Sequence, residues 1–289
     1  MKKFVLLLFI FCLSPIQVFG AEFKNYCSDK TLHKVSSGVP KFFSNVTGMN
    51  FLTTKILEAQ IQKSLKREFQ GNFNVEVYPF GTKDLMNGKF KKITIDSPKV
   101  VNKGFVVSDV HSETECDYNH VKYENGQFYF VENMVISYNA KVTQDNLQET
   151  ISSNTYLNAF SKIKVSSMGE VMFHIMKPVV EIKKDKLVMK YDVLAPHVFG
   201  SKPFSLKFST ELEVRDGKIL FRKINFGSPL ANVTLKSFMP LVNMLNPFTY
   251  NLNLDDKYNA IVKVRTIKML DGEIIINGIV VIPKSYYNN

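Results

Sequence analysis

The densest set of side chains able to bind a metal ion or transfer a proton lies between residues 109 and 120. Its members are Asp109, His111, Glu113, Glu115, Cys116, Asp117 and His120. Carboxylate, imidazole and thiolate groups of this kind bind divalent metal ions. Alternate residues on one face of a strand, however, lie about 7 Å apart, which is too far for several of them to reach one ion. Since the same alternation is typical of a strand that faces solvent, we predict neither a metal site nor a cofactor.

Catalytic motifs are also missing from the sequence. It has no His-Glu-x-x-His helix, no paired Cys-x-x-Cys and no glycine-rich phosphate loop. His174 and His197 have no acidic or nucleophilic neighbours in sequence, which is typical of ordinary packing histidines. A hydrolase whose Ser or Cys, His and carboxylate meet only in the folded chain stays open as an alternative. We predict a protein that is not an enzyme and has no catalytic residues.

A segment near the C-terminus indicates contact with hydrocarbon. Residues 233–248 are apolar nearly all round, and such a helix is buried in protein, lies in a membrane interface or faces an apolar ligand. Flexible and aromatic side chains of this kind suit acyl chains. We expect four of them to contact a lipid, namely Phe238, Met239, Val242 and Met244. Core packing under a sheet is the alternative.

A helix is predicted from Asn50 to about Phe69, with Gly71 ending it. One face carries an apolar stripe at four-residue spacing, made of Leu57, Ile61 and Leu65. Basic side chains gather towards the opposite side, including Lys63, Lys66 and Arg67. The stripe could dock on a sheet or line an acyl-chain site, and the basic residues could bind an anionic headgroup.

These elements must be positioned by a sheet, and residues 204–226 give its clearest pattern. Phe204, Leu206 and Phe208 alternate with polar residues, as in a half-buried strand. A two-residue type I′ turn at Asp216-Gly217 would place Glu211 opposite Arg222 as an ion pair. A long antiparallel hairpin is therefore expected here.

Further strands are expected along the chain, with one more helix. Thr143 is predicted to cap a helix from Gln144 to about Ile151. A strand at Phe128–Tyr138, apolar on both faces, should be central in the sheet. The other expected strands are Phe73–Phe80, Gly88–Val101, Phe105–Tyr118, Lys164–Ile175 and Lys186–Leu194, with a last hairpin at Ile261–Ile282 turning at Asp271-Gly272.

The first twenty residues resemble a bacterial export signal. Lys2-Lys3 precede an apolar run from Phe4 to Leu13, and Ala21 follows the expected cleavage point. An uncleaved anchor is the alternative. Of the 37 basic residues, two leave with the signal, so that 35 remain against 26 acidic residues, a net charge of +9. We expect a protein of the periplasm or envelope, or a secreted one, that meets anionic membrane surfaces rather than nucleic acid; a lysine-rich genome would also explain the charge.

Two cysteines remain after removal of the signal. An even pair in an exported protein favours a disulfide between Cys27 and Cys116, with two buried free thiols as the alternative.

Taken in order, four stretches between Lys55 and Pro283 resemble the LmeA-like phospholipid-binding family of bacterial envelope proteins, formerly a domain of unknown function. They are the helix Lys55–Phe69, the segment Leu85–Ile95 (LMNGKFKKITI), Phe128–Ile136 followed by the helix start at Val142-Thr143, and Gly272–Gly278 (GEIIING). The resemblance implies an exported, non-enzymatic protein in which a strongly curved antiparallel sheet wraps a helix and binds phospholipid, including anionic species. The cysteine pair and the stretch 21–50 depart from the family pattern.

We therefore expect an α+β fold: a strongly curved antiparallel sheet around the amphipathic helix, with a second short apolar helix within 233–245. Residues 1–20 would be the signal peptide, 21–49 an N-terminal extension and 50–285 a single domain. The hypothesis for function is a phospholipid or amphiphile carrier that holds acyl chains between sheet and helices. An envelope module that binds a partner protein through exposed strand edges is the main alternative.

Overall fold

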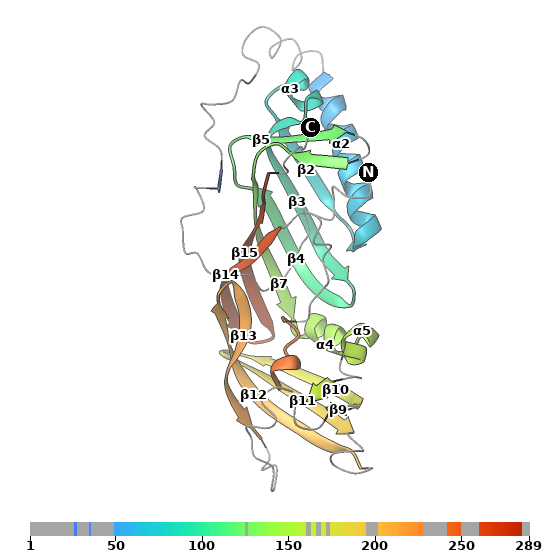
Figure 1. Cartoon of the computed structure of the whole chain (residues 1–289), viewed down its shortest axis with the longest axis vertical. Helices are drawn as coiled ribbons and strands as arrows, with labels where there is room; N and C mark the ends of the chain where they lie inside the picture. The colour runs from blue at the N-terminus through green and yellow to red at the C-terminus, as the bar shows by residue number, and fades with distance from the viewer. Residues whose placement is uncertain are drawn as a thin grey trace.

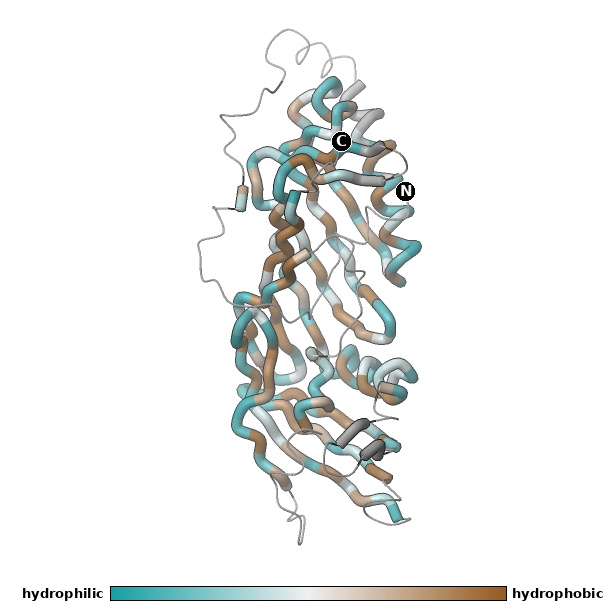
Figure 2. The backbone as a smooth tube through the Cα atoms, in the orientation of Figure 1, coloured by the Kyte–Doolittle hydropathy of each residue, from teal (hydrophilic) through white to brown (hydrophobic). Residues whose placement is uncertain are grey.

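The computed structural model describes residues 26–27, 35, 49–124, 127–159, 163–165, 169–171, 174–194, 202–227, 242–249 and 260–284. Within these residues the chain is elongated and consists mainly of antiparallel strands with a few helices (Figure 1). The α+β class with antiparallel sheets is thereby confirmed. Hydrophobic and hydrophilic residues alternate along many of the strands (Figure 2), as expected for sheets with one buried face.

The larger sheet has nine strands in the order β14-β15-β7-β4-β3-β5-β6, with β1 and β2 also paired to β3. Its strands are β1 (Gln70–Gly71), β2 (Asn74–Pro79), β3 (Lys89–Asn102), β4 (Phe105–Thr114), β5 (Asn119–Glu124), β6 (Gln127–Phe130), β7 (Met134–Thr143), β14 (Ile261–Leu270) and β15 (Glu273–Ile282). The final hairpin, β14–β15, turns at Asp271-Gly272 as predicted.

The smaller sheet has four strands in the order β10-β11-β12-β13. They are β10 (His174–Lys183), β11 (Lys186–Leu194), β12 (Phe204–Arg215) and β13 (Lys218–Phe226), and a separate short pair is formed by β8 (Ile163–Val165) and β9 (Gly169–Val171). One hydrophobic core contains residues of both main sheets.

The β12–β13 hairpin has the predicted register. Glu211 lies opposite Arg222, and Asp216 and Gly217 both have the positive φ that a type I′ turn requires. The Glu211 carboxylate and the Arg222 Nε are 4.0 Å apart. The turn also reaches the other sheet, because the Val264 N–H of β14 donates a hydrogen bond to the Gly217 carbonyl over 2.8 Å.

The four labelled helices in the described part of the chain lie on the larger sheet or at its boundary with the smaller one. They are α2 (Met49–Glu68), α3 (Thr82–Met86), α4 (Gln144–Ser152) and α5 (Asn154–Ala159). α2 covers the edge strand β2, where the buried Glu58 carboxylate accepts a hydrogen bond from the Val77 N–H over 3.1 Å. No helix among the described residues is both long enough and apolar enough to cross a membrane.

Helix α4 joins the two sheets. It begins where β7 ends, and the Thr143 hydroxyl and the Asn146 side chain form the capping box at its start. On the side of the larger sheet, the Thr150 hydroxyl accepts a hydrogen bond from the Val106 N–H of β4 over 3.0 Å. Leu147 and Ile151 enter the common core and are fully buried. The predicted cap at Thr143 is confirmed.

The opposite side of α4 covers the edge strand β10 of the smaller sheet. The Gln148 side chain accepts a hydrogen bond from the Val180 N–H and donates one to the Pro178 carbonyl, over 3.0 and 2.7 Å. One turn earlier, the Gln144 side chain accepts a hydrogen bond from the Ile182 N–H over 3.1 Å. Two glutamines at i and i+4 thus occupy backbone groups that a neighbouring strand would otherwise bind.

Three sequence predictions about boundaries are wrong. Phe128–Tyr138 is two strands, β6 and β7, and only β7 is central in the sheet. Lys164–Ile175 is not one strand, because β8, β9 and the start of β10 divide it. Gly71 does not end α2, which stops at Glu68; Gly71 belongs to β1, where a Cβ atom would lie 2.5 Å from the Lys99 carbonyl oxygen.

Tyr26 and Cys27 are attached to the larger sheet. A disulfide joins Cys27 to Cys116, just beyond β4, as predicted. Tyr26 and Cys27 pack against a small apolar cluster that includes Val135 and Ile279, and the Asn133 amide donates a hydrogen bond to the Tyr26 carbonyl over 3.0 Å. The segment therefore covers apolar residues on β7 and β15.

Replacing Gln148 with Leu keeps the size of the side chain and removes its two bonds to β10. We expect a loss of about 2 kcal/mol in the free energy of unfolding, since each such bond contributes about 1 kcal/mol. Urea unfolding followed by circular dichroism measures it. Gln60→Leu, on the exposed face of α2, is the matched control and should change stability by less than about 0.5 kcal/mol; equal effects of the two substitutions would contradict the role of α4.

Replacing Cys27 and Cys116 together with Ser should destabilise the protein by about 4 kcal/mol, because a cross-link between residues 89 positions apart restricts the unfolded chain. Thermal unfolding with and without a reducing agent measures this effect. The reducing agent should lower the melting temperature of the wild type and leave that of the double variant unchanged. Alkylation of two thiols in the unfolded, unreduced protein would show that the bond does not form.

Candidate functional site

The predicted apolar stripe of α2 is part of the protein core. Ile61 and Leu65 are 2% and 0% exposed, and Leu57 is partly buried against the same core. The helix packs on β2 at this face. These side chains already have protein partners, so an acyl chain between α2 and the sheet would have to displace them.

The predicted headgroup residues lie on the other face of α2. Lys63, Lys66 and Arg67 are all exposed, and so is the neighbouring apolar side chain of Ile56. A single lipid cannot contact these cations and the buried stripe at once, because the helix lies between them. The outer face of α2 is thus a cationic surface rather than one end of an acyl-chain site.

The four predicted acyl contacts near the C-terminus do not share one environment. Phe238 and Met239 lie outside the described residues. Val242 is fully buried, whereas Met244 is 43% exposed. The structure therefore leaves Met244 available at the surface and places Val242 in the core.

Residues 242–249 are held firmly between the two sheets. The Phe248 ring packs edge-on against Phe105 of β4, with centroids 6.3 Å apart. The buried Asn246 amide donates a hydrogen bond to the Ile219 carbonyl of β13 over 2.9 Å. The Tyr156 hydroxyl of α5 donates one to the Leu245 carbonyl over 2.6 Å. These contacts fix the segment beside the β12–β13 hairpin.

A hollow of about 440 Å³ lies between this segment and the hairpin. Its lining combines charged, amide and apolar side chains: Glu213, Arg215, Leu220, Phe221, Arg222, Asn243, Asn246 and Thr249. We call it the arginine hollow. Leu220 and Phe221 are partly buried, and Met244 follows Asn243 directly in the chain.

Two guanidinium groups dominate the charge of the arginine hollow. Glu213 lies between them: its carboxylate is 2.6 Å from the Arg215 Nη2 and 3.7 Å from the Arg222 Nε. Both arginines are more than half exposed, so the pairs are weak and the guanidiniums can exchange partners. Guanidinium groups bind phosphate and carboxylate through paired hydrogen bonds.

The acidic and histidine side chains of residues 109–120 take part in separate contacts. Among the described residues, no group of three or more His, Cys, Asp and Glu side chains is arranged to hold a metal ion. Cys116 is in the disulfide, and Asp109 pairs with Lys141 over 3.0 Å. Burial, with Lys89 and Lys122 nearby, lowers the pKa of His120.

Two other histidines lie in the described part of the chain, His111 on β4 and His174 on β10. His111 lies beside Asp96 and Glu113, His174 is exposed, and His197 is outside the described residues.

Comparisons of the chain with protein family models, with curated proteins and with solved structures give no match. The arginine hollow must therefore be judged by its own geometry.

Sequence reasoning missed the arginine hollow. The hairpin pattern predicts Arg222 only as the partner of Glu211 and assigns no role to Arg215. The two arginines lie near Asn243 and Thr249 only because the folded chain brings the β12–β13 hairpin and residues 242–249 together. The apolar character of residues 233–248 was the one signal that pointed to this region.

Replacing Tyr156 with Phe should destabilise the protein by about 1–3 kcal/mol, since it leaves the buried Leu245 carbonyl without its donor. Its hydroxyl also lies 3.1 Å from that of Tyr191. Denaturant unfolding near pH 7 measures the loss. Tyr78→Phe, at an exposed position, is the control and should change stability by less than about 0.5 kcal/mol.

The contact between Tyr156 and Tyr191 also predicts how the free energy of unfolding depends on pH. Burial raises the pKa of the Tyr156 and Tyr191 hydroxyls above the ordinary value of 10.0. The unfolded chain releases these protons near its ordinary pKa and the folded chain does not, so their contribution is complete below pH 10 and is lost as the pH rises further. Above pH 10 the stability of Tyr156→Phe should fall less steeply than that of the wild type; parallel curves would contradict this assignment.

Proposed function

We propose that this protein is an exported, non-enzymatic phospholipid-binding protein of the bacterial envelope and that the arginine hollow holds the lipid. The observation that carries the proposal is the meeting of two guanidiniums with apolar side chains in one hollow. An amphiphile needs both kinds of contact at a single place. In the described residues, α2 separates them, whereas the hollow combines them.

In this proposal the phosphate group of the lipid accepts hydrogen bonds from Arg215 and Arg222. Such charge-assisted bonds are about twice as strong as neutral ones. Glu213 is then released from the guanidiniums and can pair with a cationic headgroup such as ethanolamine. Asn243 and Thr249 supply further polar groups at the rim.

The acyl chain lies along Leu220, Phe221 and the exposed Met244. Burial of hydrocarbon contributes about 0.8 kcal/mol per CH₂ group, so contact with part of one chain is enough for a substantial gain. The flexible thioether of Met244 adapts to chains of different shape. Contacts with Phe238 and Met239 belong to the same proposal, whereas the buried Val242 supports the segment from within the core.

The cationic outer face of α2 has a different role here. Lys63, Lys66 and Arg67 bring the protein to an anionic membrane surface, where each basic residue contributes about 1 kcal/mol. Export by residues 1–20, a place in the periplasm or envelope and membership of the LmeA-like family are parts of the proposal. So is a strongly curved sheet around α2.

Contacts at the strand edges favour lipid binding over strand addition. On the edge strand β2, the Val77 N–H donates a hydrogen bond to the Glu58 carboxylate. On the edge strand β10, the Val180 N–H donates one to the Gln148 side chain. On β14, the Val264 N–H is bound to the Gly217 carbonyl. These backbone groups are occupied, and a partner strand would have to displace them.

The test combines lipid analysis with a charge-matched pair of variants. Mass spectrometry after native purification should find phospholipid with the wild type and several-fold less with Arg215→Gln/Arg222→Gln. Lys190→Gln/Lys207→Gln removes the same charge from the exposed face of β11 and β12 and should retain the lipid. Binding to vesicles of phosphatidylglycerol, phosphatidylethanolamine and phosphatidylcholine identifies the preferred headgroup.

Two results would overturn the proposal. One is a wild type that carries no more lipid than an unrelated protein purified in parallel. The other is equal loss of lipid in both double variants, which would show an effect of net charge alone. Because both arginines are exposed, their replacement should change the free energy of unfolding by less than about 1 kcal/mol, so a folded variant is available for comparison.

A further inference from the structure

A row of polar side chains crosses the exposed face of the larger sheet. Cross-strand pairing places them side by side on six strands, in the order Asn74, Asp96, His111, Asn139, Asn277 and Thr266. We call this row the polar rung. Four of its members are exposed, and the other two, Asp96 and Asn277, are partly exposed.

Hydrogen bonds orient the polar rung. The Asp96 carboxylate and the His111 Nδ1 are 2.6 Å apart. The Asn139 side-chain amide donates to the Asn277 side-chain Oδ1 over 2.5 Å, and the Asn277 side-chain amide donates to the Thr266 hydroxyl over 3.1 Å. The rung thus contains two hydrogen-bonded groups, Asp96 with His111 and Asn139 with Asn277 and Thr266.

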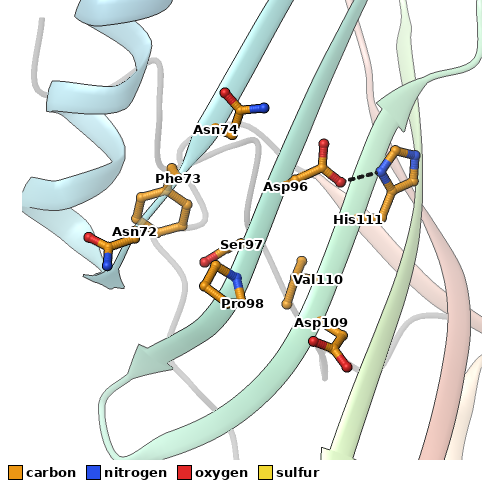
Figure 3. Close-up of a pocket in the computed structure, with 9 residues that line it drawn as sticks. All are labelled: Asn72, Phe73, Asn74, Asp96, Ser97, Pro98, Asp109, Val110 and His111. Atoms are coloured by element: carbon orange, nitrogen blue, oxygen red, sulfur yellow. Dashed lines mark hydrogen bonds and ion pairs between the residues drawn. The ribbon is translucent and has the colours of Figure 1, made fainter.

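At the β2 end, the rung enters a hollow of about 500 Å³, which we call the polar hollow (Figure 3). Its apolar lining consists of the exposed Pro98, with Phe73 and Val110 buried behind it. Polar side chains surround them, namely Asn72, Asn74, Asp96, Ser97, Asp109 and His111. The exposed ring of Pro98 can contact the C–H face of a sugar ring, and the surrounding amide and carboxylate groups can bind its rim of hydroxyl groups.

An irregularity of the sheet forms part of the polar hollow. Pro98 of β3 and Asp109 of β4 face each other without a backbone pair, between the paired residues Ser97↔Val110 and Lys99↔Ser108. Asp109 has a φ of 46°, and the pairing of β4 with β7 shifts by one residue here. The proline has no N–H to donate, and the bulge turns β4 locally. The shape of the polar hollow therefore depends on the backbone conformation of β3 and β4 at this point.

Two amides of the polar hollow are available to a ligand. The Asn72 and Asn74 side chains make no hydrogen bond to any other residue that the structure describes. Each can donate and accept at the same time, which matches the donor and acceptor properties of a hydroxyl group.

We propose that the polar hollow and the polar rung bind an uncharged, β-1,4-linked glycan chain. One sugar ring occupies the polar hollow, and the following rings lie along the rung, across the strands. Neighbouring strands are about 4.8 Å apart, close to the rise per sugar of an extended β-1,4-linked chain. Consecutive rings can therefore meet equivalent polar side chains on consecutive strands.

Charge distinguishes this site from the arginine hollow. Asp96 and Asp109 are paired with His111 and Lys141, and the described residues that line the polar hollow include no lysine or arginine that would attract phosphate, so that a neutral polyhydroxyl ligand is favoured. The glycan site does not depend on the proposed lipid binding, since it lies on another sheet and uses other residues.

Titration of ¹⁵N-labelled protein with chitotetraose and with cellotetraose tests the proposal by NMR. We expect shift changes at Asn72, Asn74, Asp96, His111 and Asn139, with at least one of the two sugars binding in the millimolar range or tighter. Maltotetraose, which has the same length and α-1,4 linkages, should bind much more weakly.

Asn74→Ala should weaken binding about tenfold through loss of its hydrogen bonds, and Asp96→Asn should weaken it similarly. Asn225→Ala removes an exposed asparagine from β13 and is the matched control. The Arg215→Gln/Arg222→Gln variant should bind the sugars like the wild type, which separates this site from the lipid site. The proposal is overturned if neither β-1,4-linked tetrasaccharide binds, if maltotetraose binds equally well, or if Asn74→Ala binds like the wild type.

Discussion

The fold depends on how helix α4 satisfies the backbone at the boundary between the two sheets. Its Thr150 hydroxyl binds β4, its Gln144 and Gln148 side chains bind the edge of β10, and its apolar face enters the common core. Buried or half-buried strand edges without partners would be costly. The helix removes this cost at the edge of β10 and also binds the Val106 N–H of β4, and so it fixes the place of β10 to β13 relative to the larger sheet.

The position of residues 242–249 is a consequence of this junction. Phe248 packs on Phe105 of the larger sheet, while Asn246 binds β13 of the smaller one. The segment can contact both only because α4 and α5 hold the sheets together. The arginine hollow is therefore a product of the junction, and its cations and apolar side chains come from parts of the chain that are distant in sequence.

The two hollows have opposite chemistry. The arginine hollow has guanidiniums beside apolar side chains, whereas the polar hollow has carboxylates and free amides beside one exposed proline. An anionic headgroup suits the first and a neutral sugar suits the second. Envelope lipids and envelope glycans occur in the same compartment, so a protein that binds both would meet its two ligands together.

Local patterns in the sequence determined the α+β class, the register of the β12–β13 hairpin, the cap at Thr143 and the cysteine pair, because turns, caps and alternation depend on neighbouring residues. The tertiary structure decided which apolar stripes became core: Ile61 and Leu65 are buried by β2, and periodicity alone cannot distinguish a protein partner from a lipid. It also decided the approach of Arg215 to Asn243 and the alignment of the polar rung, since both need long-range pairing that no local pattern encodes.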